Sequence, residues 1–175
     1  FSVAWRQVSD DTYRRCGVLG IDPAAKLDAG ARCLSPSDFG FHNAIAAADG
    51  ALRFIDFEYA GWDDPAKLAC DFFCQKAVPV PLRLFDRFVD GISAALDYQA
   101  ARTALLLPVY QIKWCCILLN EFLPTGMARR QFGGDGNADT DREILARQLR
   151  KAQAALADLP SYIDKQRQLL RPIKA

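Results

Sequence analysis

The feature that most constrains the fold is the spacing of apolar residues beyond residue 65. They recur at intervals of three and four, which places them on one face of an α-helix. Five helices are predicted, over residues 67–77, 82–96, 101–122, 140–156 and 161–170. Pro79 and Pro81 separate the first two, and Thr140 with Glu143 has capping-box spacing. Helices with one apolar face must pack together, so this part of the chain predicts a helical layer.

The first third of the chain has a different character. Asp22-Pro23 is a typical helix start and predicts a helix over 24–33. Residues 34–43 are rich in turn formers and predict a shaped loop. Asp49-Gly50 separates two short apolar runs, 44–48 and 51–57, which predicts a β-hairpin. The expected fold class is therefore mainly α with a small β-hairpin (α+β), in one domain spanning 1–175.

Composition limits the possible partners. Apolar residues make up 51% of the chain, enough for a continuous core, and the net charge of +1 with no Lys/Arg-rich tract predicts no binding to nucleic acid. The most apolar stretch, 103–119, is interrupted by Pro108, Gln111 and Lys113, so no membrane partner is expected. A Gly-rich polar loop over 125–139 is expected to be a surface connection.

The six cysteines do not suggest a secreted scaffold. Cys115 and Cys116 are adjacent within an apolar helical pattern, an arrangement that is poorly suited to a disulfide framework. We interpret all six as reduced core residues. Residues 1–10 contain Arg6 and Asp10 and have no apolar core of a signal peptide, so we expect a cytoplasmic protein.

Three polar residues occur at intervals that suit phosphoryl transfer. Asp38 is followed five positions later by Asn43, and Asp56 comes after the predicted hairpin turn. Phosphoryl transfer needs a carboxylate beside the attacking hydroxyl and oxygen ligands that hold magnesium against the nucleotide phosphates. The catalytic loop and metal-binding hairpin of kinases supply these groups in the same order.

The surrounding sequence resembles one family. SPSDFGFHN followed by LRFIDFEYAGWDDPAKLACDF looks like the aminoglycoside phosphotransferase and choline kinase-like family, which has a protein kinase-like fold. Members typically carry H-x-D-x-x-x-x-N, then a strand ending in I-D-[FW]-E, then D-P at the start of a helix. The match covers residues 35–73, and it departs from the pattern at Pro36, where the family has His.

The resemblance implies a role for each matching residue. Asp38 matches the catalytic base, Asn43 and Asp56 match the magnesium ligands, and the cofactors are Mg²⁺ and ATP. Asp64 and Asp71 match acidic positions that we interpret as structural. The chain would be the C-terminal helical lobe, with catalytic loop and metal hairpin over 35–73 and a helical region over 79–171.

The acceptor is the least determined part. Residues 37–71 hold seven acidic and two basic side chains, which favours a cationic acceptor. Tyr59 and Trp62 offer aromatic faces for cation–π contacts, and Glu58 matches the acidic residue of I-D-F-E. These three are the candidate substrate-binding residues. Aromatic side chains more often simply pack.

The expected activity is transfer of the γ-phosphoryl of ATP to a hydroxyl of a small acceptor such as an aminoglycoside, choline or ethanolamine. Kinases of this kind also need an N-terminal lobe with a phosphate-covering loop and a lysine, and neither precedes Asp38. The chain starts at Phe1, and its only methionine is Met127, so we expect it to belong to a larger protein and to be inactive alone. The alternative is a non-catalytic kinase-like module that binds a partner.

Overall fold

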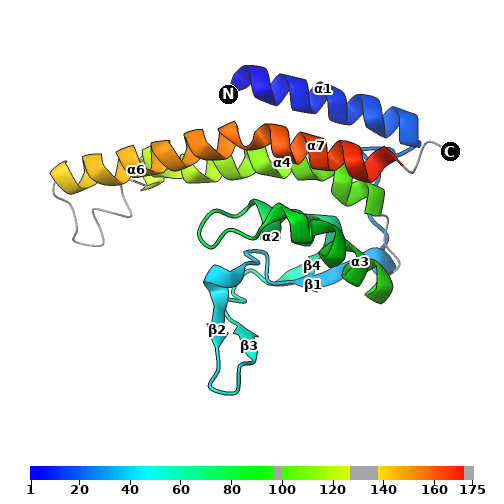
Figure 1. Cartoon of the computed structure of the whole chain (residues 1–175), viewed down its shortest axis with the longest axis horizontal. Helices are drawn as coiled ribbons and strands as arrows, with labels where there is room; N and C mark the ends of the chain where they lie inside the picture. Colours follow the sequence, from blue (N-terminus) through cyan, green and yellow to red (C-terminus); the bar gives the residue numbers. More distant parts are fainter. Residues whose placement is uncertain (97–99, 127–137, 172–175) are drawn as a thin grey trace.

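The computed structural model describes residues 1–96, 100–126 and 138–171 (Figure 1). The helices in these ranges are α1 (Ser2–Leu19), α2 (Pro65–Cys74), α3 (Phe85–Ala95), α4 (Ala100–Leu118), α6 (Ala138–Ala157) and α7 (Leu159–Leu170). Short 3-10 helices span Ala29–Ala31, Phe41–Asn43, Leu82–Leu84 and Asn120–Phe122. Two small sheets complete the described part. The predicted class, mainly α with a small β-hairpin, is confirmed.

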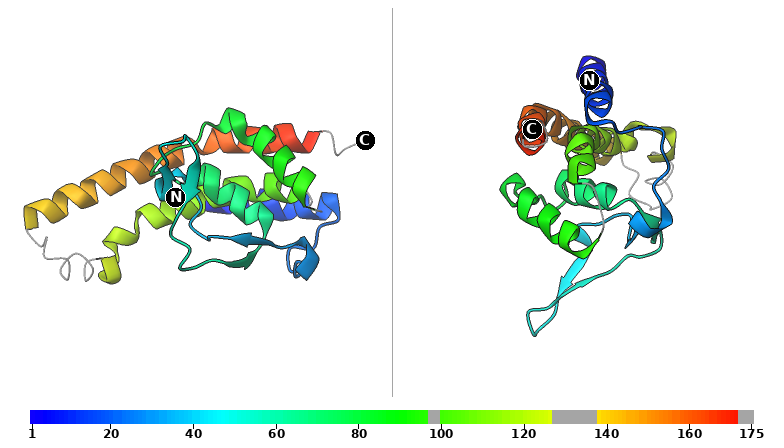
Figure 2. Two further views of the ribbon diagram at one scale, coloured as in Figure 1. Left: turned by 90° about the horizontal axis from the view of Figure 1, so that it is seen from below. Right: turned by 90° about the vertical axis from the view of Figure 1, so that its right-hand side faces the viewer.

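Helix α4 is the centre of the helical layer. It packs against α1, α2, α6 and α7, and it buries Leu107, Ile112 and Cys115 between them (Figure 1). By length and composition alone, residues 100–122 could also cross a membrane. Figure 1 and the right view of Figure 2 show α1 on the side of α4 away from the β-hairpin, with α7 beside α4. The fold thus has a helical face and a hairpin face.

The two sheets each contain two antiparallel strands. Strand β2 (Ala44–Ala46) pairs with β3 (Leu52–Phe54), and Gly50 in the turn between them has a φ of 80°, which glycine tolerates. This confirms the predicted hairpin. Strand β1 (Cys33–Ser35) pairs with β4 (Gly61–Asp63). That pairing was not predicted, because three-residue strands are too short for alternation to be visible.

The predicted helix over 24–33 is wrong. The Asp22 carboxylate accepts from the Ala24 N–H as a cap would (2.9 Å), but only a turn and the short helix Ala29–Ala31 follow. Apart from Leu27, the apolar side chains of this segment are small, mostly alanine, and a helix with so little apolar surface to bury is marginal. Helix α1, which the sequence did not indicate, instead buries just Val8 and Cys16 and ends at Gly20, whose φ is 66°.

Two smaller expectations also need correction, and a third falls largely outside the described residues. Helix α6 begins at Ala138, so Thr140 lies within it and is not its N-cap. Cys116 is exposed and Cys33 is half-buried, whereas the other four cysteines are buried as expected. Most of the Gly-rich loop expected over 125–139 lies outside the described residues.

Candidate active site

The β1–β4 pairing closes the base of a long loop that contains most of the candidate site. Ser35 lies opposite Gly61 in this sheet, so residues 36–60 leave and return at the same place. Asp38, Asn43 and Asp56 all lie within this segment. Helix α2 begins directly after β4, which fixes the base of the loop to the helical layer. The β1–β4 pairing, which the sequence did not predict, therefore positions Asp38, Asn43 and Asp56, which the sequence did predict.

Asp38 follows a residue with an unusual backbone conformation. Ser37 has a φ of 70°, and the Asp38 N–H donates to the Pro36 carbonyl at 2.9 Å, which forms a γ-turn. The Ser37 N–H donates to Ser35 Oγ at 3.1 Å. Non-glycine residues with positive φ concentrate at functional sites, where the surrounding structure holds them. The turn leaves the Asp38 side chain half exposed, at 50%.

Two side chains of the loop hold Asp38. The Nε2 atom of His42 lies 3.1 Å from Asp38 Oδ1, and the amide of Asn43 donates to the Asp38 carbonyl at 3.0 Å. Because the Asn43 NH₂ group is used in this way, its amide oxygen is the atom available to a cation. His42 is thus a hydrogen-bonding residue within the loop, and its contact is with the Asp38 carboxylate itself.

Gly40 is required by lack of space. A Cβ atom at this position would lie 2.6 Å from Cε1 and Nδ1 of His42 and 3.1 Å from Cγ of Gln75. The flanking Phe39 and Phe41 both pack on Phe72 of α2, with ring centroids 4.9 and 5.1 Å apart. These aromatic contacts anchor the loop to the core. The sequence showed the aromatic residues but gave no sign of their partner.

Asp56 lies beyond strand β3, not on the predicted strand. Its φ of 64° is in the left-handed region, which aspartate adopts more readily than most residues. The preceding Ile55 donates its N–H to the Asn43 carbonyl at 2.9 Å. Asn43 and Asp56 therefore lie at the same end of the hairpin, and Asn43 in turn contacts Asp38. The structure brings these three predicted residues into one region.

The candidate substrate-binding residues are exposed and lie further along the loop. Tyr59 and Trp62 are 73% and 72% exposed, and Glu58 is also exposed. Trp62 is on β4, opposite Leu34. Within the described ranges, no hydrogen bond or ion pair joins these three side chains to Asp38, Asn43 or Asp56. These largely exposed side chains suit contact with a ligand, but no contact among the described residues assembles them into one pocket.

Lys67 of α2 connects the loop to a buried carboxylate, and the sequence analysis missed it. Its Nζ lies 2.7 Å from Asp63, 3.5 Å from Asp71 and 3.5 Å from Ser37 Oγ. Burial alone would lower the pKa of Lys67, but the hydrogen bonds and charges of the two carboxylates outweigh it and raise the pKa. The i, i+4 spacing of the three charged residues is the signal that could have revealed this contact.

Asp64 and Asp71 are structural, as predicted. Asp64 caps α2 by accepting from the Ala66 N–H at 2.8 Å, and it pairs with Arg102 of α4 at 2.9 Å. The Asp71 side chain is 2% exposed and is bound by Lys113 at 2.8 Å and by the Trp114 indole N–H at 2.9 Å. Both carboxylates join α2 to α4, and the indole of Trp114 is engaged in the core.

The donor atoms around Asn43 and Asp56 fit magnesium that arrives with a nucleotide. No group of three or more His, Cys, Asp or Glu side chains able to hold a metal is found among the described residues. An amide oxygen and a carboxylate are, however, the hard ligands that Mg²⁺ takes, and this ion commonly has only one or two protein ligands, with water and phosphate oxygens for the rest. Two such donors at one end of a hairpin match that pattern.

Comparisons of this chain with protein-family models, with curated proteins and with solved structures found no match. The resemblance to the aminoglycoside phosphotransferase and choline kinase-like family therefore stays a prediction that rests on the motif residues.

Proposed function

We propose that the chain is the C-terminal lobe of a phosphotransferase that moves the γ-phosphoryl group of ATP to a hydroxyl of a small, cationic acceptor. The observation that carries the proposal is the arrangement around Asp38. Asp38 follows a positive-φ turn, and its half-exposed carboxylate contacts His42. Its backbone carbonyl accepts from the Asn43 amide, and the Asn43 carbonyl accepts from the N–H of Ile55, the residue before Asp56. A base and two metal-ligand types thus lie in one region.

In this proposal Asp38 aligns the acceptor hydroxyl and takes its proton as the oxygen attacks the γ-phosphorus. A bond forms between that oxygen and phosphorus, and the bond from phosphorus to the bridging oxygen of ADP breaks. Asn43 and Asp56 would hold the magnesium, which would supply the positive charge that neutralises the phosphates. Glu58, Tyr59 and Trp62 would attract the cationic part of the acceptor.

The decisive experiment is Asp38→Asn in the complete protein, including its nucleotide-binding lobe. The amide keeps the shape of the side chain but cannot take the proton, so phosphoryl transfer should fall by about 100-fold or more while nucleotide affinity stays within about twofold. Asp49→Asn in the hairpin turn is the matched control, because its side-chain oxygen still accepts from the Ala51 N–H. Transfer within a few-fold of wild type in Asp38→Asn would remove Asp38 from the role of base.

One observation favours the alternative, a non-catalytic module that binds a partner. The hairpin and the residues after it expose large apolar side chains, namely Ile45, Leu52, Ile55 and Phe57. Such a surface suits coverage by another domain or by another protein. Magnesium-dependent ATP binding by the complete protein separates the two functions, because only the phosphotransferase needs the nucleotide.

A further inference from the structure

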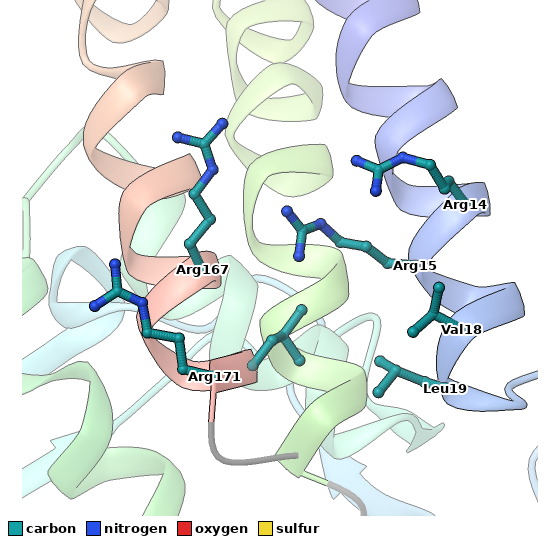
Figure 3. A pocket seen from close by; sticks show the side chains of 7 residues that line it. Arg14, Arg15, Val18, Leu19, Arg167 and Arg171 are labelled. Atoms are coloured by element: carbon teal, nitrogen blue, oxygen red, sulfur yellow. The ribbon is translucent and has the colours of Figure 1, made fainter. Parts of the chain in front are cut away.

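A pocket lined by four arginines lies on the helical face, remote from the hairpin (Figures 1 and 3). It is formed between α1 and α7 and has a volume of about 310 Å³. Its lining also includes the apolar side chains of Leu19 and Leu170. The four arginines are Arg14, Arg15, Arg167 and Arg171. The proposed phosphotransferase does not use any of these residues.

The arginines outnumber their carboxylate partners. Arg14 and Arg15 share a single carboxylate, that of Asp11, with Arg15 Nε 2.6 Å from it. Arg167 pairs with Asp164 at 3.3 Å, and both of these side chains are largely exposed. Arg171 has no ion pair within the described part of the chain. Four guanidinium groups against two carboxylates leave an excess of two positive charges at the pocket.

All four arginines line the same pocket. Figure 3 shows Arg14 and Arg15 reaching from α1 toward α7, whereas Arg167 and Arg171, one turn apart on α7, extend along that helix and away from α1. A guanidinium group presents a rigid fork of N–H donors that matches the oxygens of a phosphate. Arg15 is the least exposed of the paired arginines of the pocket, at 20%. Most of its side chain is therefore already shielded from water before a ligand binds.

Stabilisation of a helix dipole explains only two of the four arginines. Arg167 lies in the last turn of α7 and Arg171 is its C-cap, where basic side chains stabilise the helix dipole. The last turn of α1 contains no basic residue, however, so Arg14 and Arg15 lie too early in the helix to serve its end. Both pair instead with Asp11 within α1, at i, i+3 and i, i+4 spacing, and Figure 3 shows that they also reach toward α7.

We propose that this pocket binds the phosphate group of a small, soluble organic phosphate. A phosphate monoester carries close to two negative charges at neutral pH, which equals the excess of two positive charges. The volume is at the lower end of ligand pockets, which fits a small molecule, and Leu19 and Leu170 receive its apolar part. The proposal is independent of Asp38 and of the phosphotransferase activity.

The test is calorimetric titration of the protein with inorganic pyrophosphate and with AMP, in buffer containing EDTA so that no metal-bound phosphate forms. Both probes should bind with a Kd of about 1 mM or tighter. The double variant Arg167→Ala/Arg171→Ala should weaken binding at least about tenfold, and Arg167→Lys/Arg171→Lys should weaken it severalfold because the fork geometry is lost. The exposed pair Arg83→Ala/Arg150→Ala removes the same charge elsewhere and should change the Kd less than twofold.

Three results would overturn the proposal. The first is no binding of either probe at 25 °C up to about 10 mM. The second is an equal loss of affinity in the control pair, which would indicate net charge and not a pocket. The third is binding of vesicles containing phosphatidic acid that soluble pyrophosphate does not compete with, which would assign the arginines to a membrane surface. Circular dichroism of each variant establishes that the helices are intact.

Discussion

His42 Nε2 lies 3.1 Å from Oδ1 of Asp38, and this contact depends on Gly40, midway between them in the sequence. The ring of His42 occupies the space that a Cβ of Gly40 would need. Its Nδ1 is buried without a hydrogen-bond partner in the described part of the chain, so the ring is held by packing and by the one contact with Asp38. The direction of the proposed base is thus set by a glycine two residues away.

Gly40→Ala should therefore disturb both stability and catalysis. The new Cβ would force the His42 ring to move, at a cost of about 1–3 kcal/mol in the free energy of unfolding. The Asp38 carboxylate would lose its contact, and phosphoryl transfer by the complete protein should fall by at least about tenfold. Urea unfolding measures the first effect, and initial rates of transfer measure the second.

A double-mutant cycle separates this steric cause from a general effect of alanine. In a His42→Ala background the clash with the ring is gone, so Gly40→Ala should cost clearly less than in wild type. Gly30→Ala is the control, because a Cβ there meets nothing within 4 Å. Equal costs of Gly40→Ala in both backgrounds would contradict the proposed contact between ring and glycine.

Asp56→Gly should uncouple stability from metal binding. Glycine adopts the left-handed backbone of this position without strain, so the free energy of unfolding should stay within about 1 kcal/mol of wild type. The carboxylate is lost, so magnesium-dependent binding of ATP to the complete protein should weaken strongly. Titrations of ATP at several magnesium concentrations provide the measurement. An unchanged magnesium dependence would show that Asp56 serves the backbone turn and not the metal.

The sequence predicted the parts of this fold that local chemistry determines. The Asp49-Gly50 turn indicated the β2–β3 hairpin, and Asp64-Pro65 indicated the start of α2. The sequence also predicted the long helices that have a continuous apolar face, because their buried apolar residues recur at helical spacing. Helix α1 was missed because it buries only two residues completely, too few to create a visible period.

The sequence identified the candidate site residues, but it did not predict the contacts that hold them in place. Asp38, Asn43 and Asp56 could be named from their intervals, whereas the contacts that position them are set by packing between distant segments. Lys67 reaches back to Ser37, and Phe72 receives two aromatic rings of the loop. Such partners are separated by about thirty residues in sequence, and no single-sequence pattern specifies them.

The cysteines should differ widely in reactivity. Burial raises the pKa of the Cys70 and Cys74 thiols, which also approach the carbonyls of Thr103 and Leu107 in the core. Cys116 is exposed on α4. Iodoacetamide at pH 8 should modify Cys116 in the folded protein at least about 100-fold faster than Cys70 or Cys74, because only thiolates react. Peptide mapping by mass spectrometry gives the rates, and similar rates at all three would contradict the described core.

Lys67→Met should lower stability in a way that depends on pH. The variant leaves Oδ2 of Asp71, which is buried and has no hydrogen bond in the described residues, without its nearby cation, although Lys113 still binds Oδ1. We expect a loss of about 1–3 kcal/mol at pH 7, measured by urea unfolding. Lys26→Met, at an exposed lysine of the loop after α1, is the control and should change stability by less than about 0.5 kcal/mol.

The pH dependence of that loss identifies its cause. The pKa of Lys67 is raised in the folded protein above its ordinary value of 10.5, so its contribution to stability is fully present below that value. It is lost as pH rises through the folded value, where Lys67 gives up its proton. The difference between wild type and Lys67→Met should therefore be constant between about pH 7 and 9 and narrow above about pH 10.5. A difference that persists unchanged at about pH 11.5 would assign the loss to packing of the lysine stem and not to its charge.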